Sequence, residues 1–483
     1  MEATALRNTT DGDTARGTGA PARERLLVIG GDAAGMSAAS QARKRRGPGE
    51  LEIVVVERGH HVSYSACGIP YYVGGVVDDL DRLIARTPEQ FRERGIEVRM
   101  RTEAVEIDPG RARVRVRDVD GGGESWEPYD QLMIATGAVP VRPPLPGADA
   151  KGVHGVQILG DGVAIRRAVV DGGARRAVVV GGGYIGLEMA EAMVMRGLEV
   201  SLVDQADHPM QTLDPDMGGL IADAIRDVGV HLHLGEPVEG FDTSPDGHVT
   251  AVRTGSRTLP ADIVVLGLGV KPASGLARDA GIEVGPTGGI VTDRRMRTPT
   301  EGVWAAGDCV ESRHLVSGGP VAIPLGTHAN KQGRVAGINI GGGYATFPGV
   351  AGTAVCKICR VEVARTGLSE REAAAAGFAT LSAVVKSTTR AGYHPGATEM
   401  WTKLIVERRS GRLLGAQIVG EENAAKRVDG LAIALWNRMT AEDMTGLDLG
   451  YAPPFAPTWD PVLIAARKAA EAVEADMAEQ AAD

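Results

Sequence analysis

The sequence predicts an α/β protein with two Rossmann-like units, followed by an α+β domain at its C-terminal end. Two observations carry this prediction. An apolar strand runs into a glycine-rich loop at residue 30, and the same strand, loop and helix pattern recurs at residue 181. Beyond residue 348, strands and helices follow without a further glycine loop. A chain of 483 residues is long enough for about two to four domains.

The first unit has the layout of a dinucleotide site. A strand over 25–30 ends in the glycine loop, a helix follows over 36–46, and a second strand over 51–57 ends in a carboxylate. The helix N-terminus would face a pyrophosphate and the carboxylate a ribose, although Asp32 replaces the usual second glycine. A strand-to-helix turn without a ligand is the alternative. The residues expected at the cofactor are Gly30, Ala33, Ala34, Gly35 and Glu57.

The second unit carries the complete G-x-G-x-x-G pattern, and two such loops in one chain argue against coincidence. Its carboxylate, Asp204, lies 204 − 181 = 23 residues after the first glycine. No arginine occurs at 205–210, so Asp204 would accept a hydrogen bond from a free ribose 2′-hydroxyl and repel a 2′-phosphate. NADH is therefore favoured, with NADPH left open. The residues expected at the nicotinamide cofactor are Gly181, Gly183, Gly186 and Asp204.

Two further segments indicate that the first cofactor is FAD. The strand at 132–135 ends in Thr136 and Gly137, where backbone can approach a cofactor. The strand at 302–306 leads to Asp308, which can accept hydrogen bonds from ribityl hydroxyls. Each segment alone could be an ordinary strand and turn. Together with the first loop they predict FAD in the first unit and a nicotinamide dinucleotide in the second.

A lone cysteine, Cys67, stands in the run SYSACGIPYYVGG, shortly after the first unit. A helix that begins near Gly68 would stabilise the thiolate through its N-terminal N–H groups and dipole. Without a neighbouring cysteine, Cys67 would bond to something foreign: a small thiol, a persulfide sulfur or an oxygen. The alternative is a buried cysteine that acts only as an apolar side chain.

The other three cysteines are expected to play no redox role. Cys356 and Cys359 fall in a stretch, residues 353–363, that has the pattern of one strand. Side chains three apart on a strand face opposite sides, so their sulfur atoms would diverge. Cys309 directly follows Asp308 and is expected to be structural.

Composition and charge exclude several classes of protein. The net charge of −10, from 52 basic and 62 acidic residues, argues against nucleic-acid binding. No apolar stretch approaches the roughly 20 residues of a membrane helix, which argues against a membrane protein. Four cysteines favour the reducing cytoplasm, and no metal site is expected. Residues 1–24 are expected to form a disordered tail.

Eight ordered segments of the chain match one family. They are IGGDAAGMSAASQARKR, SYSACGIPYYVGG, IATGAVP, VVGGGYIGLE, GPTGGIVTD, VWAAGDC, GYHPGA and YAPPFAPTWDPV. On these segments the chain resembles the pyridine nucleotide-disulfide oxidoreductases over roughly residues 25–465. Within that family it is most similar to the single-cysteine branch of coenzyme A-disulfide reductases, NADH oxidases and NADH peroxidases.

The resemblance implies a division into domains. An FAD-binding domain would consist of residues 25–142 and 271–345, and an NAD(P)H-binding domain of 143–270. A dimerisation domain would cover 346–465, and a helical or flexible tail 466–483. The resemblance also implies a homodimer in which the partner's third domain completes each active site.

The resemblance assigns catalytic roles as well. Cys67 would be the redox cysteine against the flavin, and Tyr393 and Tyr451 would supply or orient a proton for the departing thiol. For each tyrosine, packing at an interface is the alternative. Peroxidase and oxidase relatives carry a histidine beside their cysteine, and Ala33 stands at that position, which tells against stable peroxide chemistry. Ala66 replaces the asparagine that precedes the cysteine in the reductases.

A basic helix end favours a phosphate-bearing thiol as the substrate. The S-Q-x-R pattern of the reductases, which reaches towards coenzyme A, recurs at residues 40–43 and continues with three basic residues. A solvated helix end is the alternative. The residues expected to bind the substrate are Gln41, Arg43, Lys44, Ser63 and Arg86.

The sequence leaves three functions under consideration. The favoured one is an NAD(P)H-dependent flavoprotein that reduces a small-molecule disulfide or persulfide at a single cysteine, as coenzyme A-disulfide reductases do. The second is an NADH oxidase or peroxidase that cycles through cysteine sulfenic acid. The third, from a different class, is a flavin redox sensor or electron-transfer partner.

Overall fold

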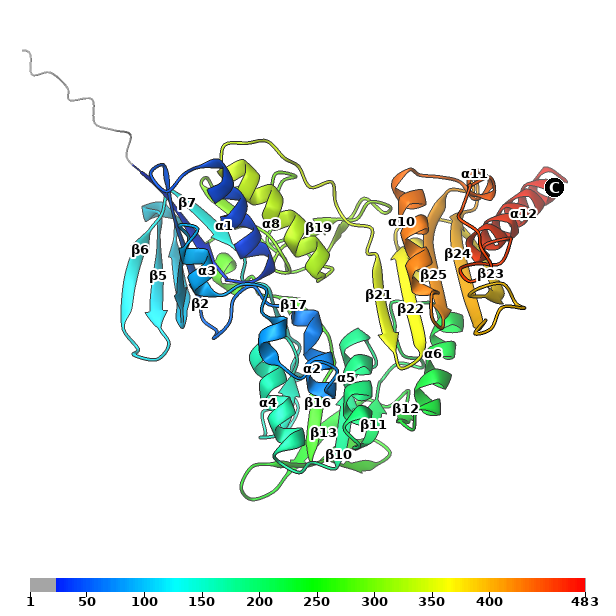
Figure 1. Cartoon of the computed structure of the whole chain (residues 1–483), viewed down its shortest axis with the longest axis horizontal. Coiled ribbons are helices and arrows are strands. Elements are labelled where there is room, and N and C mark those ends of the chain that lie inside the picture. The colour runs from blue at the N-terminus through cyan, green and yellow to red at the C-terminus, as the bar shows by residue number, and fades with distance from the viewer. Residues whose placement is uncertain (1–22, 483) are drawn as a thin grey trace, which may run out of the picture.

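The computed structural model describes residues 23–482 (Figure 1). Most of the tail predicted for residues 1–24 lies outside the described residues. Glu24 already belongs to the first strand, β1 (Glu24–Ile29). The first ordered strand thus begins one residue earlier than the sequence indicates.

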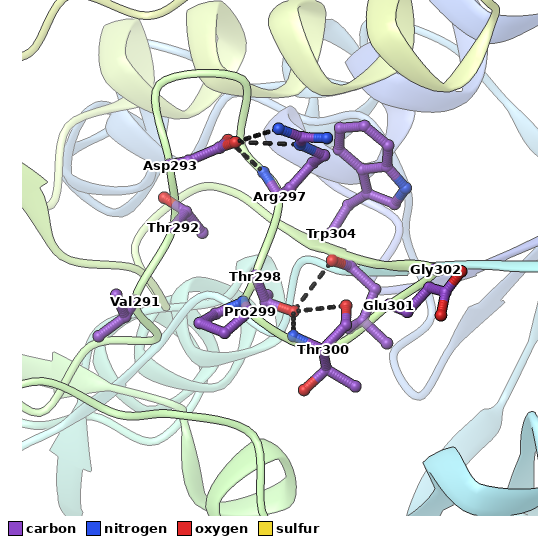
Figure 2. Close-up of a pocket in the computed structure, with 11 residues that line it drawn as sticks. Val291, Thr292, Asp293, Arg297, Thr298, Pro299, Thr300, Glu301, Gly302 and Trp304 are labelled. Atoms are coloured by element: carbon purple, nitrogen blue, oxygen red, sulfur yellow. Dashed lines mark hydrogen bonds and ion pairs between the residues drawn. The ribbon is translucent and has the colours of Figure 1, made fainter.

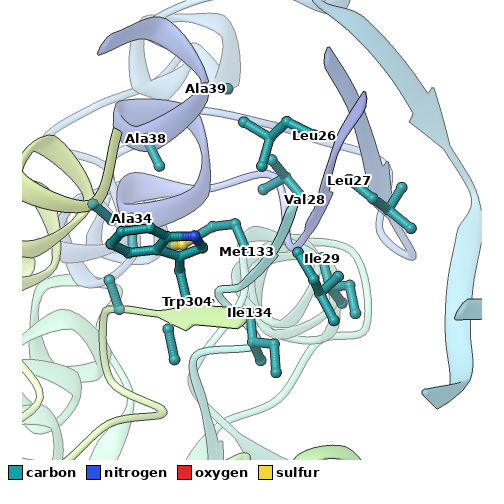
Figure 3. Close-up of a cluster of buried hydrophobic side chains, with 14 of the residues drawn as sticks. Leu26, Leu27, Val28, Ile29, Ala34, Ala38, Ala39, Met133, Ile134 and Trp304 are labelled. Carbon is teal, nitrogen blue, oxygen red and sulfur yellow. The ribbon is translucent and has the colours of Figure 1, made fainter. Parts of the chain in front are cut away.

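The first unit is built on a parallel five-stranded sheet in the order β18-β7-β1-β2-β3. Residues 26–29 of its central strand are all buried, in a core cluster that also contains Ile107 and Val114 of a neighbouring antiparallel sheet. Figure 3 shows Leu26 and Val28 facing the helix that carries Ala38. The other strands are β2 (Leu51–Glu57), β3 (Glu97–Met100), β7 (Gln131–Ile134) and β18 (Val303–Ala305).

Two helices of the first unit, α1 (Ala33–Arg45) and α8 (Gly326–Ile340), pack with their backbones in close contact. A Cβ on Gly333 would overlap the carbonyl oxygen of Ala34, and a Cβ on Gly337 that of Ala38. Because glycine has no side chain, α8 can lie directly on α1. The contact joins two parts of the sequence that are nearly 300 residues apart.

The second unit repeats the parallel architecture, in the strand order β12-β11-β10-β16-β9. Its strands are β9 (Val153–Gly155), β10 (Arg176–Val180), β11 (Glu199–Val203), β12 (His231–His233) and β16 (Ile263–Leu266). Its helices are α4 (Leu159–Val170), α5 (Tyr184–Met195) and α6 (Pro215–Asp227). Helix α2 (Ile69–Gly74), which follows Cys67, packs on α4 and α5 (Figure 1).

The third domain is an antiparallel sheet in the order β21-β22-β25-β24-β23. Helix α10 (Val428–Trp436) packs on β22 and β25, and α12 (Pro461–Ala482) packs on β23 and β24. The strands are β21 (Ala354–Ile358), β22 (Val361–Gly367), β23 (Thr380–Thr388), β24 (Glu399–Glu407) and β25 (Leu413–Gly420).

A buried charge pair joins the second unit to the third domain. The ammonium of Lys403 on β24 lies 3.2 Å from the carboxylate of Asp214, and each side chain is only 3% exposed. The amide of Gln417 on β25 donates to the same carboxylate at 2.7 Å. A buried charge is tolerated when it is paired and hydrogen-bonded, so this contact fixes one relative position of the two domains.

Short elements complete the chain. The strands β8 and β17 pair where the chain leaves the first unit and later returns to it. The remaining strands are β4 (Thr102–Asp108), β5 (Arg113–Asp118), β6 (Glu124–Pro128), β8 (Ala138–Pro140), β13 (Val238–Thr243), β14 (Val249–Thr254), β15 (Thr258–Pro260), β17 (Val270–Pro272), β19 (Ser312–Arg313) and β20 (Pro320–Val321). The remaining α-helices are α3 (Pro88–Arg92), α7 (Gly275–Asp279), α9 (Glu370–Ala375) and α11 (Ala441–Thr445).

The predicted fold class is confirmed: two Rossmann-like α/β units precede an α+β domain. The predicted domain limits stay predictions. The limit at residue 465 falls inside α12, whose Ala465, Ala466 and Ala469 are buried in the core of the third domain. The stretch after 465 is therefore helical as far as Ala482, and its buried residues extend to Asp476. Among residues 23–482, no helix is both long and apolar enough to span a membrane.

The close contact of α1 with α8 predicts the effect of adding one methyl group. Gly337→Ala should destabilise the protein by about 1–3 kcal/mol, since the new Cβ displaces the α1 backbone at Ala38. Gly326→Ala is the matched control, because a Cβ on Gly326 of the same helix meets no atom within 4 Å. Urea unfolding of both variants provides the measurement. Equal stabilities would contradict the close contact.

Candidate active site

The first glycine loop has the geometry of a pyrophosphate site. Gly30 has a φ of 103°, which favours glycine, and a Cβ on Gly35 would overlap the carbonyl oxygen of Gly30. The carboxylate of Glu57 accepts hydrogen bonds from the N–H of Gly31 at 2.8 Å and of Gly59 at 2.6 Å. The end of β2 is thus tied to the loop, and α1 begins directly after it.

The second loop is built in the same way. Gly181 has a φ of 102°, and a Cβ on Gly186 would overlap the carbonyl oxygen of Gly181. The carboxylate of Asp204 accepts from the N–H of Gly182 at 2.6 Å and of Ala206 at 2.9 Å. Both loops leave room for a phosphate beside bare backbone, and each has an acidic residue where a ribose would lie. The residues therefore fit one dinucleotide each.

The other predicted flavin residues lie at the carboxyl edge of the first sheet. Gly137 has a φ of 69°, and the hydroxyl of Thr136 donates to the carbonyl of Ala273 at 2.7 Å. Burial raises the pKa of the Asp308 carboxyl to about 6. The buried Gln332 of α8 accepts a hydrogen bond from the N–H of Gly307 at 2.8 Å and so fixes the segment before Asp308. Nothing in the local sequence identifies Gln332.

Cys67 lies in a single 3₁₀ turn (Ala66–Gly68) that leads into α2. The cysteine is exposed at the surface. Nevertheless the pKa of its thiol is raised, first by desolvation and then by the carboxylates of Glu188 and Asp308, with Asp32 a smaller cause. Desolvation and these carboxylates act against the thiolate, whereas the helix start is expected to favour it. The sequence did not indicate that α5 brings Glu188 towards Cys67.

The acidic residues around Cys67 titrate near neutral pH. Burial raises the pKa of Asp32 to about 6, and burial together with Glu191 raises that of Glu188 to about 7. A carboxyl with a higher pKa in the folded than in the unfolded state takes up a proton on folding between about pH 4 and 7. Its contribution to stability is present at the acidic end of this range and is lost as the pH rises through it.

The structure brings Tyr393 and Tyr451 together. Tyr393, in the loop between β23 and β24, is 79% exposed, and Tyr451, before α12, is 49% exposed. Desolvation raises the pKa of Tyr393, and the hydrogen bond and charge of the Tyr451 phenol raise it further. In Figure 1, β23 and β24 lie beside α12, on the side of the third domain that faces away from α2. The tyrosine pair and Cys67 thus lie on different parts of one chain.

Of the predicted substrate residues at the end of α1, Arg43 binds the protein's own backbone, whereas Lys44 is exposed to solvent. The guanidinium of Arg43 donates to the carbonyls of Arg46 at 3.0 Å, Leu51 at 2.8 Å and Gly95 at 2.8 Å. It therefore holds the start of β2, and this position differs from the predicted role in phosphate binding. Lys44 is exposed.

The remaining predicted substrate residues have separate positions. Gln41 lies beside α8, since a Cβ on Gly337 would approach the Gln41 Cβ to 2.8 Å. Ser63 has a positive φ of 49°, and its N–H donates to the carbonyl of Gly31, so it anchors the cysteine segment to the first loop. The exposed Arg86 stacks over the ring of Phe91 at 5.9 Å.

Asn330 and Arg334 of α8 lie beside the predicted substrate residues of α1, although the local sequence does not indicate this position. The hydroxyl of Ser37 donates to the side chain of Asn330 at 2.9 Å, which aligns α1 with α8. One turn further, Gln41 on α1 and the exposed Arg334 on α8 follow on the same side. The surface along this helix contact therefore presents an amide and a cation together.

The remaining cysteines are free thiols in the structure. Cys356 is buried in β21, but Cys359 lies in the turn to β22 with a φ of 55°. The single strand predicted for 353–363 is thus wrong: the stretch is a hairpin. Cys309 is fully buried, and its thiol donates to the carbonyl of Ala306 at 3.3 Å.

A cavity of about 530 Å³ lies beside β18 (Figure 2). Its lining residues all fall between 291 and 304, and they include none of the predicted site residues. One of its two acidic residues, Asp293, already binds Arg297 at 2.9 Å. The cavity is therefore separate from the two dinucleotide loops and from Cys67.

Comparison with protein families identifies the chain. Residues 24–333 match the model of the pyridine nucleotide-disulphide oxidoreductases, and residues 353–461 match the dimerisation domain of the same family. The chain belongs to this family. FAD and a nicotinamide dinucleotide are thereby confirmed as its cofactors, and the prediction of an oxidoreductase is confirmed with them.

Individual relatives resemble the chain over nearly its whole length. An NAD(P)H sulfur oxidoreductase (CoA-dependent) from Pyrococcus abyssi is 41% identical, over 92% of this chain and 98% of its own. An NADH oxidase from Methanocaldococcus jannaschii is 36% identical, over 92% of this chain and 98% of its own. The solved structure of an NAD-dependent persulfide reductase from A. fulgidus is 41% identical, with a TM-score of 0.90, and covers 93% of this chain and 84% of its own.

The position of Asp204 predicts the choice of dinucleotide. Asp204→Ala should lower the ratio of kcat/KM for NADH to that for NADPH by about tenfold, through loss of a charge-assisted hydrogen bond to the 2′-hydroxyl. Asp207→Ala, an exposed acidic residue three positions on, is the control and should leave the ratio unchanged. Steady-state kinetics with both dinucleotides measure it. An unaltered ratio in Asp204→Ala would refute the assignment.

The carboxylates near Cys67 predict its reactivity. Glu188→Gln removes the largest charge effect on the thiol, so its pKa should fall and alkylation of Cys67 by iodoacetamide at pH 7.5 should accelerate by about threefold or more. Glu191→Gln is the matched control, because Glu191 is one turn away on α5 and is not a cause of the Cys67 shift. Peptide mass spectrometry follows the rate. A faster reaction in Glu191→Gln alone would contradict the prediction.

Proposed function

We propose that this chain is an NADH-dependent flavoprotein that reduces a small disulfide or persulfide, of the coenzyme A kind, at Cys67. One observation carries the proposal: the single cysteine lies between the two dinucleotide loops. Among the groups that raise the Cys67 pKa, Asp32 and Asp308 come from the first unit and Glu188 from the helix that follows the second loop. A thiol at this junction can receive electrons that enter from the second unit.

The chemistry of Cys67 is thiol–disulfide exchange. Its thiolate attacks one sulfur of the substrate, so a mixed disulfide with Cys67 forms while the other half leaves as a thiolate. Bound FAD would take hydride from NADH and pass two electrons to sulfur. The mixed disulfide is thereby cleaved, which restores the Cys67 thiolate and releases the second thiolate. Glu188, whose pKa is about 7, can take or give a proton beside Cys67 as the cycle turns.

Each leaving thiolate needs a proton, and the tyrosine pair suits this task. A phenol donates a hydrogen bond well, and its two-bond side chain holds a defined position. Since the third domain is a dimerisation domain, we infer a homodimer in which the tyrosine pair of one subunit faces Cys67 of the other. Within one chain, the strands β23 and β24 that flank the Tyr393 loop lie on the side of the third domain away from α2 (Figure 1), which supports this arrangement.

The surface along the contact of α1 with α8 is proposed as the substrate contact. Gln41, Lys44 and Arg334 offer one amide and two cations to phosphate oxygens, which arginine and lysine bind through charge-assisted hydrogen bonds. Arg43 is left out of this set because three backbone carbonyls already occupy its guanidinium. The relative named as a CoA-dependent sulfur oxidoreductase supports a thiol carrier of this kind.

NADH oxidase activity is the second candidate. The relative from Methanocaldococcus jannaschii is named NADH oxidase at 36% identity, which favours it. Ala33, in the first turn of α1, offers only a methyl group where a sulfenic acid would need a polar neighbour. A disulfide or persulfide is therefore the better supported oxidant.

The proposal predicts the effect of removing the thiol. Cys67→Ser should lower NADH-dependent turnover of coenzyme A disulfide or persulfide by at least about 10³-fold, while NADH-dependent reduction of a small quinone continues. Cys359→Ser, which replaces another free thiol, is the control and should retain disulfide turnover. Disulfide turnover that survives in Cys67→Ser would overturn the mechanism. Oxygen consumption equal to NADH consumption, with no response to any disulfide, would favour the oxidase instead.

A further inference from the structure

Arg427 is a largely buried arginine that binds four acceptors in the third domain. It directly precedes α10, and its side chain is only 11% exposed. Its guanidinium donates to the carboxylate of Asp460 at 3.1 Å and to the carbonyls of Thr389 and Phe455, each at 2.8 Å. A fourth donor reaches the carbonyl of Asn423.

Two of these acceptors belong to the loops that carry the active-site tyrosines. Thr389 begins the loop that contains Tyr393, and Phe455 lies four residues after Tyr451. The loops also touch directly, because the N–H of Ala391 donates to the carbonyl of Pro453 at 3.0 Å. Arg427 therefore binds both loops from within the domain, while the tyrosine side chains stand at its surface.

The third acceptor fixes the far end of the second loop. Asp460 is buried, and its carboxylate accepts the N–H of Val462 at 2.9 Å at the first turn of α12. The loop that holds Tyr451 is thus anchored at Asp460 through α12 and at Phe455 through Arg427. Thr389 is anchored in turn by the ladder bond from its N–H to the carbonyl of Thr398, at the base of the Tyr393 loop.

We propose that Arg427 is a positioning residue for the reaction: it sets the relative position of Tyr393 and Tyr451 so that the two phenols act as a pair on the substrate. The inference rests on the proposed function, in which the pair protonates the leaving thiolate. Arg427 reaches neither the substrate nor Cys67 itself. It works through the two loops, which it holds in addition to their direct hydrogen bond at Ala391.

Only arginine can make this set of contacts. Its planar guanidinium has five N–H donors in a fixed fork, and four of them are used here by three carbonyls and one carboxylate. The ammonium of lysine is a point charge with three donors, so it can satisfy Asp460 but cannot hold both loops at once. Arg427→Lys should therefore fold with the ion pair to Asp460 kept, yet lose the pairing of the tyrosines.

The experiment compares Arg427→Lys and Arg427→Met with Arg408→Met. Arg408 also binds an aspartate of α12, Asp476, at 2.9 Å through Nε, but it contacts neither tyrosine loop. Both Arg427 variants should lower kcat for coenzyme A disulfide by about 10- to 100-fold, whereas Arg408→Met should not. NADH-dependent reduction of a small quinone, which reports a folded and flavin-loaded protein, should stay within about twofold of wild type in all three.

A pH profile separates a positioning role from a structural one. The neighbouring Tyr451 raises the pKa of Tyr393 after desolvation does, so separation of the pair should lower that pKa. The alkaline limb of kcat/KM for the disulfide should move to lower pH in Arg427→Lys and stay in place in Arg408→Met. An unchanged limb in Arg427→Lys would overturn the proposal.

A double-mutant test distinguishes failure of this inference from failure of the proposed function. In a Tyr393→Phe/Tyr451→Phe background, adding Arg427→Lys should cost no further activity, because the pair it positions is gone. A further loss equal to that in the wild type would overturn the role of Arg427 alone. A phenylalanine double variant as active as the wild type would instead overturn the role of the tyrosines in the proposed function, and the role of Arg427 with it. Neither result bears on Cys67, whose role is tested separately by Cys67→Ser. If Arg427→Met fails to fold, Arg427→Lys and Asp460→Asn carry the comparison.

Discussion

The hydrogen bond from each glycine loop to the carboxylate at the end of the next strand is the interaction on which the rest of the site depends. Glu57 holds the first loop and Asp204 the second, at 2.8 and 2.6 Å. The cysteine segment is then attached to both loops. Ser63 donates its N–H to the first loop, and α2 packs on α5, which the second loop begins. Cys67 therefore owes its position to two loops that are 150 residues apart.

The chemistry at this junction follows from what is buried beside it. Carboxyl groups from two units lie near one thiol, so the protein alone disfavours the thiolate. In the proposed cycle the thiolate is needed only when a disulfide sulfur that it can attack is present. The acidic surroundings restrain a nucleophile that would otherwise exchange with other disulfides in a cell.

The features that local sequence determines could be predicted: the two loops, their carboxylates, and the family that their order indicates. Features that depend on contacts between distant segments could not. The sequence shows Glu188 only as part of a glycine motif and not as a neighbour of Cys67. The positions of Gln332 and Arg334 could not be predicted, because α8 contacts α1 through glycine backbone rather than through a recognisable side-chain pattern. Arg43 matches the S-Q-x-R pattern of the reductases. Its long side chain nevertheless reaches three backbone carbonyls, and the pattern does not reveal these contacts. The turn at Cys359 was missed because a tight hairpin has the same alternation as one strand.

The contact of α8 with α1 also bears on how the chain folds during synthesis. The edge strand β18 and helix α8 of the first unit leave the ribosome only after the entire second unit, whose parallel strands all fall between residues 153 and 266. The second unit can therefore fold first. The strands β1, β2 and β7 are made earlier, but the edge of β7 stays unpaired until β18 has been synthesised. An exposed, apolar, half-built sheet is the state most open to aggregation, and its lifetime is set by translation rather than by local propensity.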